Sequence, residues 1–303
     1  MMKTPLVSIS CITYNHESYI RECLDGFLMQ ETNFPFEVLI HDDASTDKTA
    51  DIIREYEAKY PDIIKPIYQT ENQWSKRKGG INIRFNFNRA QGKYIAMCEG
   101  DDYWTDPLKL QKQVDFLEAN EDCIYVFHKV QELKAGKFRT DELNDTNKTH
   151  FNLDDIYNKN YAHTPSIVFR ATDFSKFPSF YFTAMPGDHT LQKMLLRNGG
   201  YANFMEDVMA VYRRHDGGIW STDNGASYKV ETTITRINLN KYFKKKNFSL
   251  CYPLADYVAK NGFEKVSFFN YYRLIFSQMR FSDIFNPKNK YLLFPWVYYL
   301  VKK

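Results

Sequence analysis

Short apolar segments alternate with amphipathic segments through the first hundred residues of this 303-residue chain. The apolar segments are rich in β-branched residues, which is typical of buried strands. The segments between them repeat apolar residues at helical spacing, as Tyr19, Cys23 and Phe27 do. This alternation predicts an α/β chain with a doubly wound, mostly parallel sheet and right-handed crossovers. The predicted strands lie at 6–12, 36–40, 63–68 and 93–98.

The rest of the chain has a weaker pattern. Residues 129–160 are polar and weakly periodic, so we expect a loop or a short hairpin there. Residues 75–80 predict a basic, glycine-bearing loop, and an Asn-rich helical stretch follows it and ends at Gly92. The other predicted elements are a helix after Pro107, strands at 124–127, 166–169 and 208–212, and a helix at 189–196.

Polar or acidic residues follow three of the predicted strands. Ligands bind at the carboxyl ends of the strands in doubly wound sheets, so these residues are the first candidates for a functional site. They are Thr13-Tyr14-Asn15, Asp42-Asp43 and Glu99-Gly100-Asp101-Asp102.

Glu99, Asp101 and Asp102 place three carboxylates on one turn after an apolar strand. Like charges this close repel one another unless a cation lies among them. Mg²⁺ and Mn²⁺ take oxygen ligands from one or two carboxylates and from substrate phosphates. The alternative is an acidic turn in which Asp102 caps the next helix, and the segment by itself favours neither hypothesis.

The acidic cluster after the neighbouring strand favours a binding site. A carboxylate there can accept the imide hydrogen of uracil, and Tyr14 offers a flat face for stacking. Ser45 or Asp47 is expected to cap the following helix, so the structural alternative competes only for Asp42 and Asp43. Two acidic clusters at neighbouring strand ends therefore indicate a ligand site.

Composition excludes several other classes of protein. The formal charge is only +3, and basic residues do not interleave with aromatic ones until the last third, so we expect no nucleic-acid partner. The 5 cysteines form no metal-binding spacing and predict reduced, buried thiols. The N-terminus has no apolar signal region, and no apolar stretch is long enough to span a bilayer. These features predict a cytoplasmic protein.

In order and spacing, four segments together resemble glycosyltransferase family 2, over roughly residues 5–220. The resemblance implies the GT-A fold, a nucleotide-diphospho-sugar donor, a divalent metal (Mn²⁺ or Mg²⁺) and inversion at the anomeric carbon. The segments are Val7-Ser8-Ile9, Thr13-Tyr14-Asn15, Asp42-Asp43-Ala44-Ser45-Thr46-Asp47 and Glu99-Gly100-Asp101-Asp102-Tyr103-Trp104.

The resemblance also implies roles for single residues. Asp43 would hold the uracil of a UDP-sugar, and Asp101 and Asp102 would contact ribose, diphosphate and metal. Glu99 stands where the family's Asp-X-Asp pattern has its first aspartate, and Trp104 closes the same segment. The residues assigned to the nucleotide are Thr13, Tyr14, Asn15, Asp42, Asp43 and Asp101.

A third acidic segment, Met185 to His189, opens a predicted helix and resembles the family motif that carries the catalytic base. An inverting transfer needs a single base, because the acceptor hydroxyl attacks the anomeric carbon directly. We assign this role to Asp188. The alternative is that Asp188 only caps the helix.

Residues 212–221 combine arginines, a histidine and paired glycines, which suits a loop that closes over a diphosphate. We expect Arg213, Arg214 and Trp220 in this loop. By resemblance, His215 would reach the metal or a phosphate, and its structural alternative is a hydrogen-bonding role.

These patterns predict a catalytic domain at 1–225 and a helical region, rich in aromatic residues and lysine, at 226–303. Aromatic and basic residues mixed on helices suit peripheral contact with a membrane at the inner face of the plasma membrane. The favoured interpretation is that these helices pack on the catalytic domain or on a second subunit.

The sequence thus predicts an inverting glycosyltransferase that acts on a saccharide or lipid-linked acceptor. The resemblance implies bacterial capsule, O-antigen or exopolysaccharide synthesis. A nucleotidyltransferase is one alternative, but it would carry a glycine- and basic-rich loop after the first strand. A non-catalytic sugar-nucleotide-binding protein is the other, and the presence of Asp43, Asp101, Asp102 and Asp188 together argues against it.

Overall fold

The computed structural model describes residues 4–77, 79–140, 143, 147–215, 218, 225–245, 247–263, 266–279, 283, 289, 292 and 295. The chain divides into two compact units. The first comprises Met1–Pro178 and Gly187–Ser221, and the second comprises Ser179–Pro186 and Thr222–Lys303.

The first unit is built on a twisted sheet whose strand order is β3-β2-β1-β4-β9-β6-β10-β5. Neighbouring strands from β3 to β4 are parallel, as are β6 and β10, while β9 runs antiparallel to β4 and β6. The predicted mostly parallel sheet is confirmed. The strands on this path are β1 (Val7–Thr13), β2 (Phe36–Asp42), β3 (Ile64–Tyr68), β4 (Tyr94–Met97), β5 (Tyr103–Trp104), β6 (Cys123–Lys134), β9 (Val168–Arg170) and β10 (Tyr201–Arg214).

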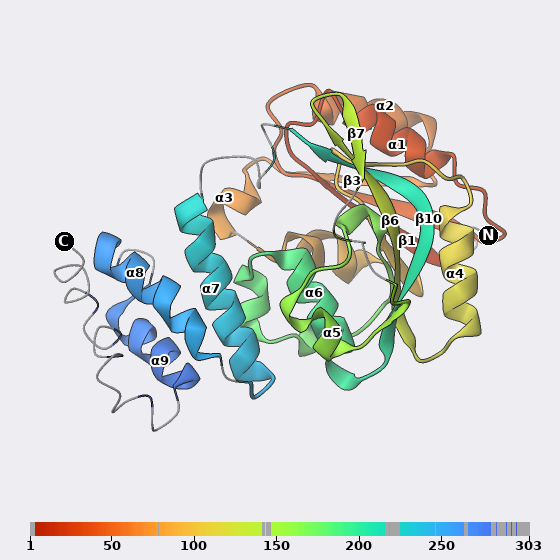
Figure 1. Cartoon of the computed structure of the whole chain (residues 1–303). Coiled ribbons are helices and arrows are strands. Elements are labelled where there is room, and N and C mark those ends of the chain that lie inside the picture. Colours follow the sequence, from red (N-terminus) through yellow and green to blue (C-terminus); the bar gives the residue numbers. More distant parts are fainter. Residues whose placement is uncertain are drawn as a thin grey trace. The chain divides into compact units, whose positions relative to one another are not determined.

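The helices α1 (Ile20–Leu28), α2 (Thr49–Lys59) and α4 (Lys109–Ala119) pack against the sheet (Figure 1). Alternation along β1 explains the two faces of the sheet. Val7, Ile9 and Cys11 belong to the apolar core that these helices complete. Ser8 and Ser10 are buried between them and are satisfied by hydrogen bonds to other side chains.

Two helical predictions differ from the structure in detail. The Asn-rich stretch is a π-helical turn, Asn82–Asn86, followed by a 3-10 turn, Phe87–Arg89. Its asparagines serve tertiary contacts, since Asn86 Nδ2 donates to the Cys11 carbonyl (3.0 Å). The predicted basic loop contains a short helix, α3 (Gln73–Arg77), because Asp43 accepts hydrogen bonds from its first amides.

The polar segment 129–160 contains the short hairpin that the sequence predicts, and it also contains a further strand and a helix. β6 continues to Lys134 and forms a hairpin with β7 (Lys137–Thr140). The hairpin turn has positive φ at Ala135 (49°) and Gly136 (71°), which is typical of a tight two-residue connection. The segment continues with β8 (His150–Phe151) and α5 (Leu153–Asn158), and the strand β9 leads to α6 (Gly187–Leu195).

The second unit has its own apolar core, formed around α7 (Gly225–Tyr242), α8 (Cys251–Asn261) and α9 (Phe268–Gln278). All five cysteines of the chain are free and buried, as predicted. None of the described helices combines the length and the apolarity needed to cross a bilayer.

Candidate active site

The turn after β4 carries the three carboxylates to the carboxyl end of the sheet. Gly100 N donates to the Ile12 carbonyl (3.0 Å), which fixes the turn beside the end of β1. A Cβ on Gly100 would lie 2.6 Å from Thr13 Oγ1 and 3.0 Å from His16 Nδ1. Glycine is therefore required here for close approach of the turn to the loop after β1.

Burial and mutual repulsion set the charges of the turn. Burial, followed by the charges of Asp101 and Glu99, raises the pKa of Asp102. Burial, with Asp101 and Asp188, raises the pKa of Glu99 to about 8. Burial would also raise the pKa of Asp101, but the hydrogen bond from His215 and the charge of His16 outweigh it and lower that pKa. Asp101 is therefore the carboxylate of this turn that ionises most readily.

The residues of the turn fit a divalent cation. Among the described residues, Asp101 Oδ1 and Asp102 Oδ2 are buried without a hydrogen-bond partner. Unsatisfied buried oxygens of this kind are rare, and carboxylate oxygens are the ligands that hard cations take. Two sets of ligand atoms, each within 4.8 Å of one another, share Asp101. One set is Glu99, Asp101 and Asp102, and the other is His16, Asp101 and His215.

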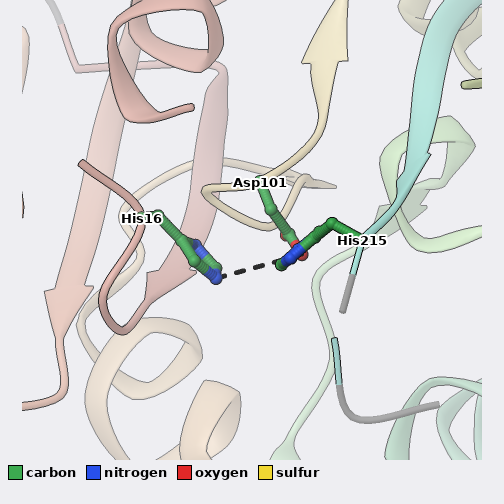
Figure 2. A group of neighbouring side chains, drawn as sticks. All are labelled: His16, Asp101 and His215. Atoms are coloured by element: carbon green, nitrogen blue, oxygen red, sulfur yellow. Dashed lines mark hydrogen bonds and ion pairs between the residues drawn. The ribbon is translucent and has the colours of Figure 1, made fainter. Parts of the chain in front are cut away.

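Two histidines from distant parts of the chain point toward Asp101 (Figure 2). His215 follows β10, and its Nε2 lies 3.0 Å from Asp101 Oδ2. His16 lies in the loop after β1, and its Nε2 is 3.9 Å from the same oxygen. Thr13, which the sequence predicts to bind the nucleotide, places its Oγ1 3.1 Å from His16 Nδ1.

Arg213 anchors the acidic turn from the end of β10. Its backbone N donates to Asp102 Oδ1 (2.8 Å), and its Nη1 donates to the Asp101 carbonyl (2.7 Å). Its Nη2 pairs with Glu22 of α1, and its guanidinium lies over the Tyr103 ring, 4.4 Å from the centroid. These contacts make Arg213 a positioning residue for the turn.

A sequence model of a known family matches residues 8–177, which include β1, β2, β4 and the acidic turn. Its description is glycosyl transferase family 2. The chain belongs to glycosyltransferase family 2. The family predicted from the four sequence segments is thus confirmed.

Curated relatives of this family 2 chain include proteins from several bacteria. An uncharacterized protein of Mycobacterium tuberculosis is 40% identical over 222 residues, which make up 71% of this chain and 60% of that protein. The putative teichuronic acid biosynthesis glycosyltransferase TuaG of Bacillus subtilis is 36% identical over 125 residues, 41% of this chain and 46% of TuaG. The chain therefore matches less than two thirds of the length of these relatives.

Solved structures of similar fold include TarS from S. aureus in complex with UDP-GlcNAc. Its TM-score is 0.62 at 19% identity, over 95% of this chain and 87% of that one. The mannosyltransferase PcManGT from Pyrobaculum calidifontis, in complex with GDP-Man and Mn²⁺, has a TM-score of 0.58 at 17% identity, over 99% of this chain and 88% of that one. The GT-A fold predicted for this family 2 chain is confirmed.

The loops after β1 and β2, both predicted to bind the nucleotide, are joined by hydrogen bonds. Asn15 Oδ1 accepts Thr46 N (2.8 Å), and Asn15 N donates to Ser45 Oγ (2.9 Å). Ser45 Oγ in turn donates to Asp42 Oδ1 (2.5 Å). Asn15 adopts a positive φ of 54°, a conformation that asparagine tolerates better than most residues. Asn15 and Asp42 therefore join the loops at this end of the candidate site.

Asp43 is buried at the end of β2 and holds the start of α3. Its Oδ1 and Oδ2 accept Gln73 N (2.7 Å) and Trp74 N (2.9 Å). Each carboxylate oxygen has two lone pairs, so Asp43 retains acceptor capacity for a base. Tyr14, in the adjacent loop, is 43% exposed and presents its ring to solvent.

Asp188 lies in the first turn of α6, where the sequence predicts the base. Burial raises its pKa, and the charge of His163 opposes this shift. The charge of Asp188 also contributes to the raised pKa of Glu99. The charge of Asp188 therefore acts on the acidic turn, although the two are far apart in sequence.

Three further predicted site residues interact with other residues of the chain. Trp104 is buried in the core, with its indole N–H bonded to a backbone carbonyl (2.9 Å). His189 Nε2 lies 3.0 Å from a backbone carbonyl of α5. Arg214 forms an ion pair with Glu132 (2.9 Å). Trp220 lies outside the described residues.

Sequence reasoning missed His16 and Glu22. His16 could have been found, because it follows the same strand end as Thr13 and is one of only 7 histidines in the chain. Glu22 gives no such signal. It lies on an amphipathic helix, and its partner Arg213 is 191 residues away.

Proposed function

We propose that this chain is an inverting glycosyltransferase that transfers a hexosyl or N-acetylhexosaminyl group from a UDP-sugar to a saccharide or lipid-linked acceptor. Such a reaction would serve the synthesis of a bacterial surface polysaccharide, such as capsule or O-antigen. The observation that carries the proposal is the acidic turn after β4, where Asp101 and Asp102 keep buried oxygens without a partner among the described residues and His215 lies 3.0 Å from Asp101. Membership of family 2 and the teichuronic acid role in the name of TuaG support it.

The proposed transfer is a direct displacement. An acceptor hydroxyl oxygen attacks the anomeric carbon while the bond from that carbon to the diphosphate oxygen breaks. Asp188 takes the proton of the hydroxyl as the new glycosidic bond forms, and the diphosphate leaves with the electron pair of the broken bond. Burial raises the pKa of Asp188, which makes it a better proton acceptor than an ordinary aspartate.

The acidic turn and its histidines would bind the donor diphosphate through a divalent metal. The metal, when bound, would neutralise the charge that develops on the departing diphosphate. Arg213 holds the backbone of the turn, and Gly100 allows it to lie against the loop after β1. PcManGT, a protein of the same fold, is in complex with Mn²⁺, which supports a divalent metal here.

The base subsite would lie at the ends of β1 and β2. Tyr14 would stack on the uracil, and Asp43 would accept its imide hydrogen with a remaining lone pair. The complex of TarS with UDP-GlcNAc supports a nucleotide-sugar donor.

The second unit would bring the enzyme to the inner face of the plasma membrane or to a second subunit. Its helix α9 exposes Phe268, Phe269 (82% exposed), Arg273 and Phe276 on its surface. An aromatic and basic surface of this kind suits the headgroup zone of an anionic membrane.

A single substitution tests the proposed reaction. Asp188→Asn keeps the size of the side chain but removes its proton acceptor, so the transfer rate should fall about 10²- to 10⁴-fold with donor affinity unchanged. Asp154→Asn, at the matching first-turn position of α5, is the control and should transfer at the wild-type rate. Near wild-type transfer by Asp188→Asn, or a product that retains the donor's anomeric configuration, would refute the mechanism.

A further inference from the structure

The two ligand sets around Asp101 predict opposite metal preferences. The set of Glu99, Asp101 and Asp102 offers only oxygen, which suits Mg²⁺. The set of His16, Asp101 and His215 offers two imidazoles, ligands that suit first-row transition metals better than they suit Mg²⁺. Mn²⁺ binds most weakly of that series, so it is the most demanding of these metals as a probe of the two imidazoles. Asp102 remains available to the oxygen set, because its Oδ1 accepts the backbone N–H of Arg213 while its Oδ2 is buried without a partner among the described residues. The number of ligand nitrogens on the metal therefore distinguishes the two sets.

The spacing of the histidine set matches one ion. Ligand atoms about 2.1 Å from the same metal lie about 3 to 4 Å from one another. The two imidazole Nε2 atoms lie 3.0 and 3.9 Å from Asp101 Oδ2. Both rings point toward Asp101 (Figure 2), and its Oδ1 is buried without a partner among the described residues.

The contacts of His16 orient its ring in the way that is usual for a histidine that binds a metal. A ligating histidine normally has its other ring nitrogen held by a hydrogen bond, which fixes the ring and the tautomer. Here Nδ1 lies 3.1 Å from Oγ1 of the buried Thr13, so Nε2 is the nitrogen that faces Asp101. The backbone N of His16 donates to Thr49 Oγ1 (2.7 Å), which anchors the loop itself. The missing side chain of Gly100 leaves the space that this pair occupies.

We propose that His16 is a ligand of the same divalent cation as Asp101 and His215. The inference deepens the proposed function, on which it rests, because it adds a second imidazole, from the loop after β1, to the metal site. It gives Thr13 the role of positioning a ligand, and Gly100 the role of leaving room for it.

The test is Mn²⁺ binding to the full chain without any donor. Calorimetry measures the affinities for Mn²⁺ and Mg²⁺, and pulsed electron paramagnetic resonance counts the ligand nitrogens from their coupling to Mn²⁺. The wild type should bind Mn²⁺ more tightly than Mg²⁺ and show two coupled imidazoles. His16→Gln should lose one of them, and its Mn²⁺ affinity should fall at least about tenfold, since even outer-shell changes at metal sites have that effect.

His150→Gln is a matched control. His150 Nδ1 lies 2.9 Å from Thr149 Oγ1, much as that of His16 lies beside Thr13, but His150 belongs to neither ligand set. This control should retain wild-type Mn²⁺ affinity and both coupled nitrogens. Circular dichroism melting of both variants checks that they fold.

The wild-type spectrum tests the proposal even if His16→Gln does not fold. A wild type that shows fewer than two coupled imidazoles, or that prefers Mg²⁺, would overturn the proposal and favour the oxygen set. Unchanged Mn²⁺ affinity in folded His16→Gln would also overturn it, while the proposed sugar transfer would stand. Conversely, two coupled imidazoles in a protein that transfers no sugar from any nucleotide-sugar would support the metal site and refute the proposed function.

Discussion

Lys109, the first residue of α4, offers a sharp test of how burial sets charge beside the acidic turn. Its side chain is 0% exposed, its Nζ lies 4.0 Å from the centroid of the Trp104 ring, and it donates to Gln113 Oε1 (2.7 Å). Burial lowers the pKa of Lys109 from 10.5 to about 7, only partly offset by Cys98 and Asp106. An amine with so few polar neighbours is expected to be partly neutral at neutral pH.

The consequence is a pH-dependent stability of known sign. Between pH 7 and pH 10.5 the unfolded chain holds a proton on Lys109 that the folded chain does not, so the free energy of unfolding rises with pH in this window. The slope approaches about 1.4 kcal/mol per pH unit, which gives a rise of about 2 kcal/mol from pH 7 to pH 9. Below pH 7 both states are protonated and the contribution becomes constant.

Lys109→Met removes the titrating group and keeps a long apolar side chain in its place. Urea unfolding, monitored by circular dichroism, measures the free energy of unfolding of both proteins from pH 7 to pH 9. The value for the variant minus that for the wild type should fall by about 2 kcal/mol over this range. Any constant effect of the methionine on packing cancels in this comparison. Lys59→Met, on the exposed surface of α2, should keep a constant difference from the wild type. Parallel curves for wild type and Lys109→Met would refute the reasoning.

Three further predictions follow from the site and the second unit. Gly100→Ala should lower the Mn²⁺ affinity at least about tenfold, because the added Cβ would lie 2.6 Å from Thr13 Oγ1, the hydroxyl that positions His16. Gly187→Ala, where an added Cβ meets nothing within 4 Å, should keep the wild-type affinity. Equal calorimetric affinities of Gly100→Ala and the wild type would contradict this prediction. UDP should raise the melting temperature more than GDP or CDP at the same concentration, and equal shifts would exclude a uracil-specific site. Phe269→Ser should lower the fraction of the protein that sediments with anionic vesicles. Phe138→Ser, which replaces an exposed aromatic residue of the first unit, should leave that fraction unchanged. If the wild-type protein does not sediment with the vesicles, membrane contact is refuted.

Much of the fold could be predicted because strand and helix periodicities are local properties of the sequence. The apolar alternation of β1 and the helical spacing of α1 fixed both elements and the face each one buries. Predictions failed where tertiary contacts decide local structure. The helix α3 forms because Asp43, 30 residues away, accepts its first amide. Asn82 and Asn86 form hydrogen bonds with β1, and their segment is not a regular α-helix.

For the site, the sequence by itself determined the family, the acidic turn and the strand ends that carry the predicted ligand-binding residues. It did so because strand ends are set by local pattern, and because ligands bind at the carboxyl ends of parallel strands. Only the tertiary structure decided which of these groups lie together. It turned His16 toward Asp101, committed Arg213 to the backbone of the turn, and brought Asp188 close enough to raise the pKa of Glu99. Such roles depend on distances and burial between segments far apart in the chain, and residue spacing along a sequence does not encode these quantities.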